Sequence, residues 1–93
     1  MSLELPLILG KLKALRAKAY ITIKGTPYTI VLDGFISVEN GSGSKVNWSL
    51  AFGSRSPIEV LNTAIKIEVE LKDRVLTFNS IKELMQWARS NTH

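Results

Sequence analysis

Several residue types that support catalysis or cross-linking are absent from this chain or nearly so. Cysteine is missing from all 93 residues, which excludes disulfides, thiolate zinc sites and a cysteine nucleophile. The single histidine, His93, is the last residue, where a fraying chain cannot hold a general base in position. No phosphate-binding or dinucleotide-binding glycine motif occurs. We therefore expect no catalytic, metal-binding or cofactor-binding residues, and a protein that is not an enzyme.

Long hydrophobic runs and internal repeats are missing as well. No apolar run approaches the about 18–20 residues that span a bilayer. No cation precedes the first apolar run and lysines follow it, the reverse of a secretory signal. Together with the lack of cysteine, this pattern indicates a cytoplasmic protein and disfavours a membrane surface as partner. Residues 1–93 are expected to form one domain, with Asn40–Ser44 as a loop.

Acidic residues are scarce in the first 26 positions. Five cations occupy this stretch: Lys11, Lys13, Arg16, Lys18 and Lys24. One acid, Glu4, opposes them, and the difference equals the whole formal net charge of +4 because cations and acids balance over residues 27–93. A cluster of positive charges attracts negatively charged molecules, so the five side chains are candidate contacts for an anion or a nucleic acid. The structural alternative is a core helix whose lysines point into solvent.

Helical periodicity and capping motifs predict three helices. A first helix is expected from residue 5 to about residue 19, since one face carries the apolar side chains Leu5, Ile8, Leu9, Leu12, Leu15 and Ala19. Gly10 weakens this helix by roughly 1 kcal/mol relative to alanine. Two Ser-x-x-Glu capping boxes, Ser56–Glu59 and Ser80–Glu83, predict a short helix over 57–64 and a last helix from 81.

Period-2 alternation predicts five strands, over about 20–24, 27–39, 45–52, 65–71 and 75–78. Gly25-Thr26 suits a two-residue turn that pairs Ile21 with Ile30. Two signals conflict at Asp33-Gly34, a strong hairpin dipeptide inside a stretch whose even positions stay uncharged. A two-residue turn there would move Ser37 and Glu39 onto the apolar face, so we favour one continuous strand with a bend at Gly34.

The segment 45–52 gives the cleanest alternation in the chain. Its apolar side chains occupy every second position: Val46, Trp48, Leu50 and Phe52. Pairing of Val38 with Val46 places all of them on the apolar face of the sheet. This pattern predicts a half-buried strand with Trp48 as a buried structural anchor.

The element order α-βββ-α-ββ-α indicates an α+β fold, a two-layer domain with a mostly antiparallel sheet of about five strands and three helices. The first five elements, residues 5–64, resemble double-stranded-RNA-binding domains in their order. The resemblance implies that the Gly25-Thr26-Pro27 turn contacts a minor groove. The sequence departs from that family at Arg55–Glu59, where one cation and one acid replace a lysine cluster.

Two functions of different classes follow from these patterns. The favoured one is a small non-enzymatic interaction or adaptor domain that self-associates through an open sheet edge or through the sheet face without helices. That face is expected to carry Tyr20, Val31 and Phe35. The alternative is a nucleic-acid-binding module that uses the basic N-terminal helix and Lys24. The expected partner is a second copy or another protein, with nucleic acid as the alternative and no small-molecule substrate.

Overall fold

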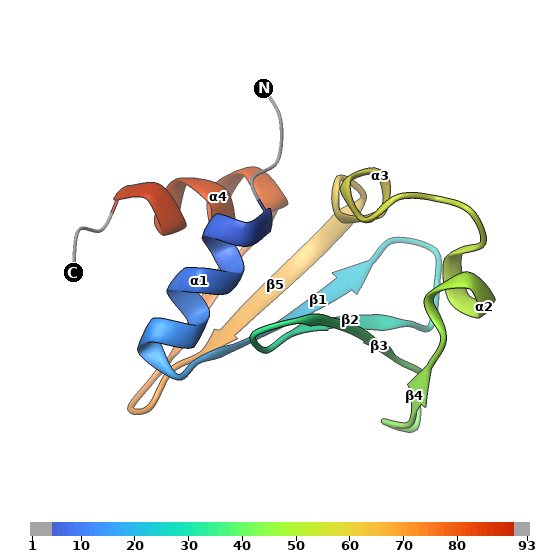
Figure 1. Cartoon of the computed structure of the whole chain (residues 1–93), viewed down its shortest axis with the longest axis horizontal. Coiled ribbons are helices and arrows are strands. Elements are labelled where there is room, and N and C mark those ends of the chain that lie inside the picture. Colours follow the sequence, from blue (N-terminus) through green and yellow to red (C-terminus); the bar gives the residue numbers. More distant parts are fainter. Residues whose placement is uncertain (1–4, 91–93) are drawn as a thin grey trace.

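The computed structural model describes residues 5–90, so Glu4 and His93 lie outside the described residues. Six strands and four helices form an α+β fold, close to the predicted five strands and three helices (Figure 1). In chain order they are α1 (Leu5–Leu15), β1 (Lys18–Ile23), β2 (Thr29–Leu32), β3 (Ile36–Glu39), β4 (Lys45–Val46), α2 (Trp48–Phe52), α3 (Pro57–Leu61), β5 (Ala64–Glu70), β6 (Val75–Phe78) and α4 (Ile81–Ser90).

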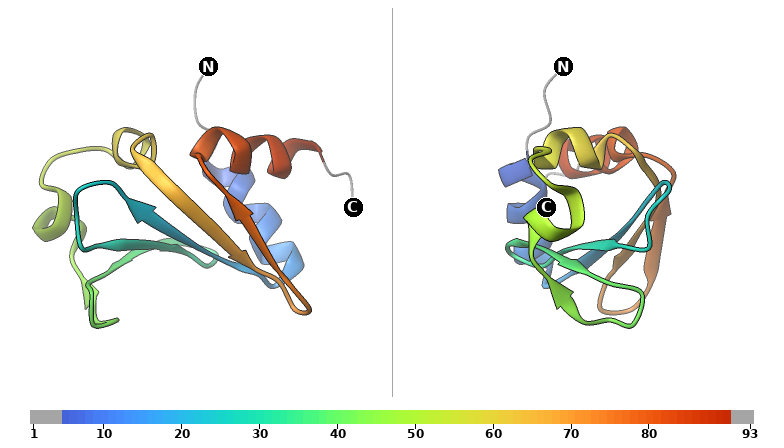
Figure 2. Two further views of the ribbon diagram at one scale, coloured as in Figure 1. Left: turned by 180° about the vertical axis from the view of Figure 1, so that it is seen from behind. Right: turned by 90° about the vertical axis from the view of Figure 1, so that its right-hand side faces the viewer.

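The strands lie in the order β4-β3-β2-β1-β5-β6, and every neighbouring pair is antiparallel. Helices α1, α3 and α4 lie on one side of this sheet, while α2 lies at the end near β3 and β4 (Figure 2). The predicted pairing of Ile21 with Ile30 is confirmed, as is that of Val38 with Val46. The sheet therefore has the register that its apolar pattern requires.

The core fills the space between the sheet and the three helices. On β1, Ala19, Ile21 and Ile23 are buried, whereas the alternate side chains of the strand point to the other face. Helices α1 and α4 contact each other and cover this core with Ile8, Leu12, Ile81, Leu84, Met85 and Ala88. Of the even positions expected to be buried in β2 and β3, Ile30, Leu32 and Val38 are buried and Ile36 is half-buried.

The prediction of one continuous strand over 27–39 is wrong, because β2 and β3 form a hairpin. Leu32 pairs with Ile36, which leaves a loop of residues 33–35 closed by the Asp33 N–H donating to the Phe35 carbonyl at 3.0 Å. With a three-residue loop, even-numbered residues of β2 pair with even-numbered residues of β3, whereas a two-residue loop would pair even-numbered with odd-numbered residues. The apolar parity therefore survives the turn, and Gly34 supplies the left-handed backbone with φ of +75°.

The strand predicted over 45–52 is also wrong. Within this segment only Lys45 and Val46 pair with β3, and residues 48–52 form helix α2. Trp48 and Phe52 are four residues apart, so a helix stacks their rings, with centroids 4.8 Å apart. The Trp48 indole N–H also donates to the Arg55 carbonyl at 2.8 Å, a contact that holds the α2–α3 connection. Trp48 is therefore half-buried rather than a buried strand residue, and Leu50 is 71% exposed.

Helix α1 ends four residues earlier than the periodicity predicts, so Lys18 and Ala19 belong to β1. A Schellman motif terminates the helix: Ala17 N–H donates to the Leu12 carbonyl at 2.8 Å, and Arg16 N–H donates to the Lys13 carbonyl at 3.1 Å. Arg16 adopts φ of +54°, and it is the only non-glycine residue with positive φ within the described residues. An arginine thus occupies the position that such motifs usually give to glycine.

Both predicted capping boxes start helices, in slightly different ways. Ser56 and Glu59 exchange two hydrogen bonds at the start of α3, of 2.9 and 3.2 Å. At α4, Glu83 N–H donates to Ser80 Oγ, but the Glu83 carboxylate accepts from Asn79 N–H instead of from Ser80. Helix α3 is shorter than predicted, because Ala64 already pairs with β1.

Glycines at two positions are expected to respond oppositely to alanine. An added Cβ meets no atom within 4 Å at Gly10 or at Gly34. Gly10→Ala should raise the free energy of unfolding by about 1 kcal/mol because α1 gains helix propensity. Gly34→Ala should lower it by about 1 kcal/mol because φ is positive there. Denaturant unfolding measures both, and a change of the same sign in both variants would contradict the loop geometry.

The α3 capping box should show itself in the pH dependence of stability. Hydrogen bonds from the Ser56 backbone and side chain lower the pKa of Glu59 from its ordinary value of 4.5. A lowered folded-state pKa stabilises the fold above the unfolded value and loses that contribution as pH falls through the folded value. The melting difference between the parent and Glu59→Gln should therefore shrink as pH falls below about 4.5. A pH-independent difference would contradict this role of the carboxylate.

Candidate functional site

The two edges of the sheet differ in how they are protected. Strand β4 has only two residues, one of them Lys45, and follows the polar loop 40–44. Strand β6 has four residues, Val75-Leu76-Thr77-Phe78, with no charge, proline or glycine, and its pairing with β5 contains no bulge. Short strands, lysines, prolines and bulges are the usual protections against pairing with another chain. Of these protections, the β6 edge has only a short strand.

Exposed apolar side chains lie along this unprotected margin. Val75 on β6 is 54% exposed. Ile65, on the part of β5 that extends beyond β6, is 53% exposed because a bulge opposite Thr22 and Ile23 takes it out of the core alternation. Figure 2 shows β6 at the outer margin of the sheet, and no strand within residues 5–90 pairs with its free edge. A strand from another chain therefore has access to its backbone.

The sheet face without helices is mostly polar, and it does not present the three predicted association residues as one apolar patch. Val31 is only 6% exposed, because Tyr20 and Ser37 flank it in register near the middle of the sheet. Tyr20 is half-buried. Phe35 is 59% exposed, but it lies in the β2–β3 loop rather than on the face itself. The expectation that Val31 is accessible is therefore wrong.

Phe35 is partnered by a lysine from the edge strand. Lys45 pairs with Glu39 at the far end of β3, yet its ammonium lies 5.6 Å from the Phe35 ring centroid. Its aliphatic stem therefore runs along β3 toward the β2–β3 loop. The contact lies within the range of cation–π attraction and brings a positive charge to an exposed ring.

The five predicted basic residues do not form a single surface. Lys24 follows the last residue of β1, about 20 Å along the strand from its start. Lys11 lies over the Trp87 ring of α4 at 5.0 Å. Lys18 is on β1, where its ammonium lies 3.7 Å from the Asp33 carboxylate. Lys13 and Arg16 remain together near the end of α1.

Lys13 and Arg16 line a groove between the end of α1 and the β2–β3 loop. The groove has a volume of about 500 Å³, within the range of about 300–1,000 Å³ that is typical of ligand sites. Its walls are Leu12, Lys13, Arg16, Ala17, Asp33, Gly34 and Phe35. Two cations, one paired acid and the exposed residue Phe35 thus line one groove, which we call the α1 groove.

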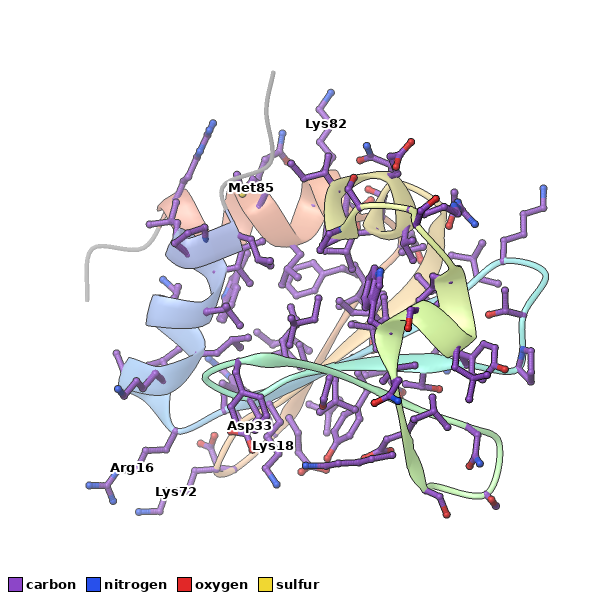
Figure 3. All side chains as sticks on the ribbon, turned by 45° about the vertical axis from the view of Figure 1, so that its right-hand side comes forward. Arg16, Lys18, Asp33, Lys72, Lys82 and Met85 are labelled. Carbon is purple, nitrogen blue, oxygen red and sulfur yellow. The ribbon has the colours of Figure 1, made fainter. Side chains whose placement is uncertain are left out.

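Two further cations lie near residues that line the α1 groove, and both come from the part of the sequence whose charges balance. The β5–β6 turn lies beside the α1–β1 junction, because Lys18 pairs with Glu70 at the end of β5. Figure 3 shows Lys72 of that turn extending on the same side as Arg16. Lys45 lies at the ring of Phe35, a residue that lines the groove, but does not itself line it. Sequence reasoning missed Lys45 and Lys72 because it counted charge along the chain and not across the sheet.

No protein-family model, curated protein or solved structure matches this chain. Among residues 5–90, no helix has the length and apolarity to cross a bilayer. In the same part of the chain, no three histidine or carboxylate side chains are grouped as metal ligands.

Substitution of a charged residue at Val31 and at Phe35 should affect stability differently, because Val31 is buried and Phe35 is exposed. Val31→Lys buries an ammonium inside the sheet and should lower the free energy of unfolding by more than about 2 kcal/mol. Phe35→Asp changes an exposed loop side chain and should cost less than about 0.5 kcal/mol. Thermal and urea unfolding measure both effects. Equal stability of the two variants would show that Val31 is accessible.

Proposed function

We propose that this chain is a small non-enzymatic interaction domain, an adaptor, that self-associates through β6. The supporting observation is the contrast between the two sheet edges. The β4 edge is short and carries a lysine, whereas the β6 edge is uncharged and regular, with exposed Val75 in the strand and exposed Ile65 on β5 beyond its end. Unpaired N–H and C=O groups on such an edge are a template for pairing with another strand.

A second copy is the partner that this edge fits most simply. Two β6 strands related by a two-fold axis run antiparallel, and each presents the same donors and acceptors to the other. Neither strand brings a charge to the seam, so pairing desolvates no unpaired ion. The two six-stranded sheets would join into one continuous sheet.

The size of the seam sets the expected strength of the dimer. Four paired residues bury little surface, well below the about 1,200–2,000 Å² of stable complexes. We therefore expect a weak dimer with a dissociation constant on the order of 10 μM, equivalent to about −7 kcal/mol. The proposal assigns the domain to the cytoplasm, in keeping with the absence of cysteine from the sequence.

Lysines on the β6 edge should abolish the dimer without harming the fold. Val75 pairs with Glu70, and Thr77 pairs with Glu68, so a lysine at either position gains an acidic neighbour within the monomer. In the dimer, the same lysines of two copies would repel each other across the seam. Sedimentation equilibrium over a range of about 5–500 μM should show a monomer–dimer equilibrium for the parent and only monomer for Val75→Lys/Thr77→Lys.

The matched control places a lysine on another exposed apolar residue. Leu50 on α2 is 71% exposed and distant in the fold from β6, so Leu50→Lys should dimerise as the parent does. A parent that stays monomeric at about 500 μM would refute self-association. Loss of the dimer in Leu50→Lys but not in Val75→Lys/Thr77→Lys would place the interface elsewhere and refute pairing through β6.

A further inference from the structure

We propose that the α1 groove binds single-stranded nucleic acid, with a base stacked on Phe35 and the neighbouring phosphates held by Lys13 and Arg16. This site is separate from the β6 edge and takes a different class of partner. The inference depends on one convergence. Phe35, whose side chain is exposed, and two cations line the same groove, although they come from the β2–β3 loop and the end of α1.

The charge around the groove favours an anion. Lys13 and Arg16 line it, and Lys45 adds a third cation at the Phe35 ring. The only acid on its wall is Asp33, whose carboxylate already lies 3.7 Å from the Lys18 ammonium. On the sheet, Glu39 and Glu70 face Lys45 and Lys18 across neighbouring strands, and in the β5–β6 turn Asp73 lies between Lys72 and Arg74. Cations therefore outnumber acids where a ligand would lie.

The aromatic ring selects the kind of anion. Phe35 is 59% exposed, the largest exposed fraction among the aromatic side chains of the described residues. An exposed ring beside a positively charged groove is the usual platform for unpaired bases, and each stacked base contributes about 1–3 kcal/mol. A duplex presents no free base face to such a ring. An acidic peptide would use the cations but not the ring.

The backbone at Arg16 gives an independent indication. Its φ of +54° at the end of α1 is a conformation in which glycine avoids about 1–2 kcal/mol of strain. The side chain therefore occupies a position where stability alone would favour glycine. Residues held in sparsely populated conformations are concentrated at functional sites. Arg16 lines the groove, where a phosphate contact accounts for an arginine at this position.

The decisive variant is Arg16→Gly, because its two expected effects have opposite signs. Glycine should relieve the strained backbone and raise the melting temperature, while loss of the guanidinium should weaken binding several-fold. The probe is a fluorescently labelled oligothymidine of about 12 nucleotides, with binding measured by anisotropy over a salt series. If three phosphates are contacted, the parent should show a slope of log K against log salt of about −2, and Arg16→Gly should reduce its magnitude by about 0.7.

Phe35 variants test stacking separately from charge. Phe35→Ala should weaken binding about tenfold at unchanged salt slope, which corresponds to about 1.4 kcal/mol. Phe35→Leu keeps an apolar side chain but lacks the ring, and should lose nearly as much affinity. A hybridised duplex of the same length should bind less tightly than the single strand.

The charge-matched controls lie away from the groove. Lys24 follows β1 at its other end, and Lys82 lies on α4 at a distance from Arg16 (Figure 3). Lys24→Gln and Lys82→Gln should bind the oligonucleotide almost as the parent does, whereas Lys13→Gln should bind it several-fold more weakly. Equal losses of affinity in all three variants would show that binding depends on net charge alone and would overturn the α1 groove as the binding site. Unchanged affinity in Phe35→Ala, or equally tight binding of polyglutamate, would overturn it as well.

Discussion

The pairing of β1 with both β2 and β5 is the constraint on which the rest of the structure depends. Strands β2, β3 and β4 follow one another through short loops, and β5 and β6 form a second hairpin; β1 joins these two groups into one sheet. Its inward side chains Ala19, Ile21 and Ile23 are buried beneath the helices. A shift of β1 by one residue would turn these side chains to solvent and bury Tyr20 and Lys18. The register of this strand therefore decides which face becomes the core and which carries charge.

The predicted fold class follows from periodicity and capping, because these depend on residues close together in the chain. The capping box at Ser56, the apolar stripe of α4 and the register across Gly25 are of this kind. The two wrong elements arose where one pattern fits two structures. A spacing of four places Trp48 and Phe52 on one face of a strand and also of a helix. A three-residue loop at 33–35 preserves the same parity as an uninterrupted strand, so alternation alone cannot distinguish them.

The candidate surfaces were less predictable, since they depend on neighbours across the sheet. Val31 has the parity of an outward residue, yet its central position between Tyr20 and Ser37 buries it. The cations counted along the first 26 residues are dispersed, with Lys11 against Trp87 of α4 and Lys24 beyond the far end of β1, while Lys45 of β4 lies at the Phe35 ring. The unprotected β6 edge could be recognised only once the strand order was known, because Val75–Phe78 resembles any half-buried strand.

The two proposed surfaces are compatible with one another because the strand order separates them. The β2–β3 loop and β6 are three strands apart in the sheet, about 14 Å at a spacing of about 4.8 Å. No residue of β6 lines the α1 groove, so a second copy paired along β6 would not use the residues of the groove. A two-fold dimer thus presents two grooves, and one long single strand that bridges them gains effective concentration at the second site. Weak pairing along a short edge would then be strengthened by the ligand, since each bridged strand holds two copies together. In such a system, a weak edge and a shallow groove suffice for an assembly that nucleic acid strengthens.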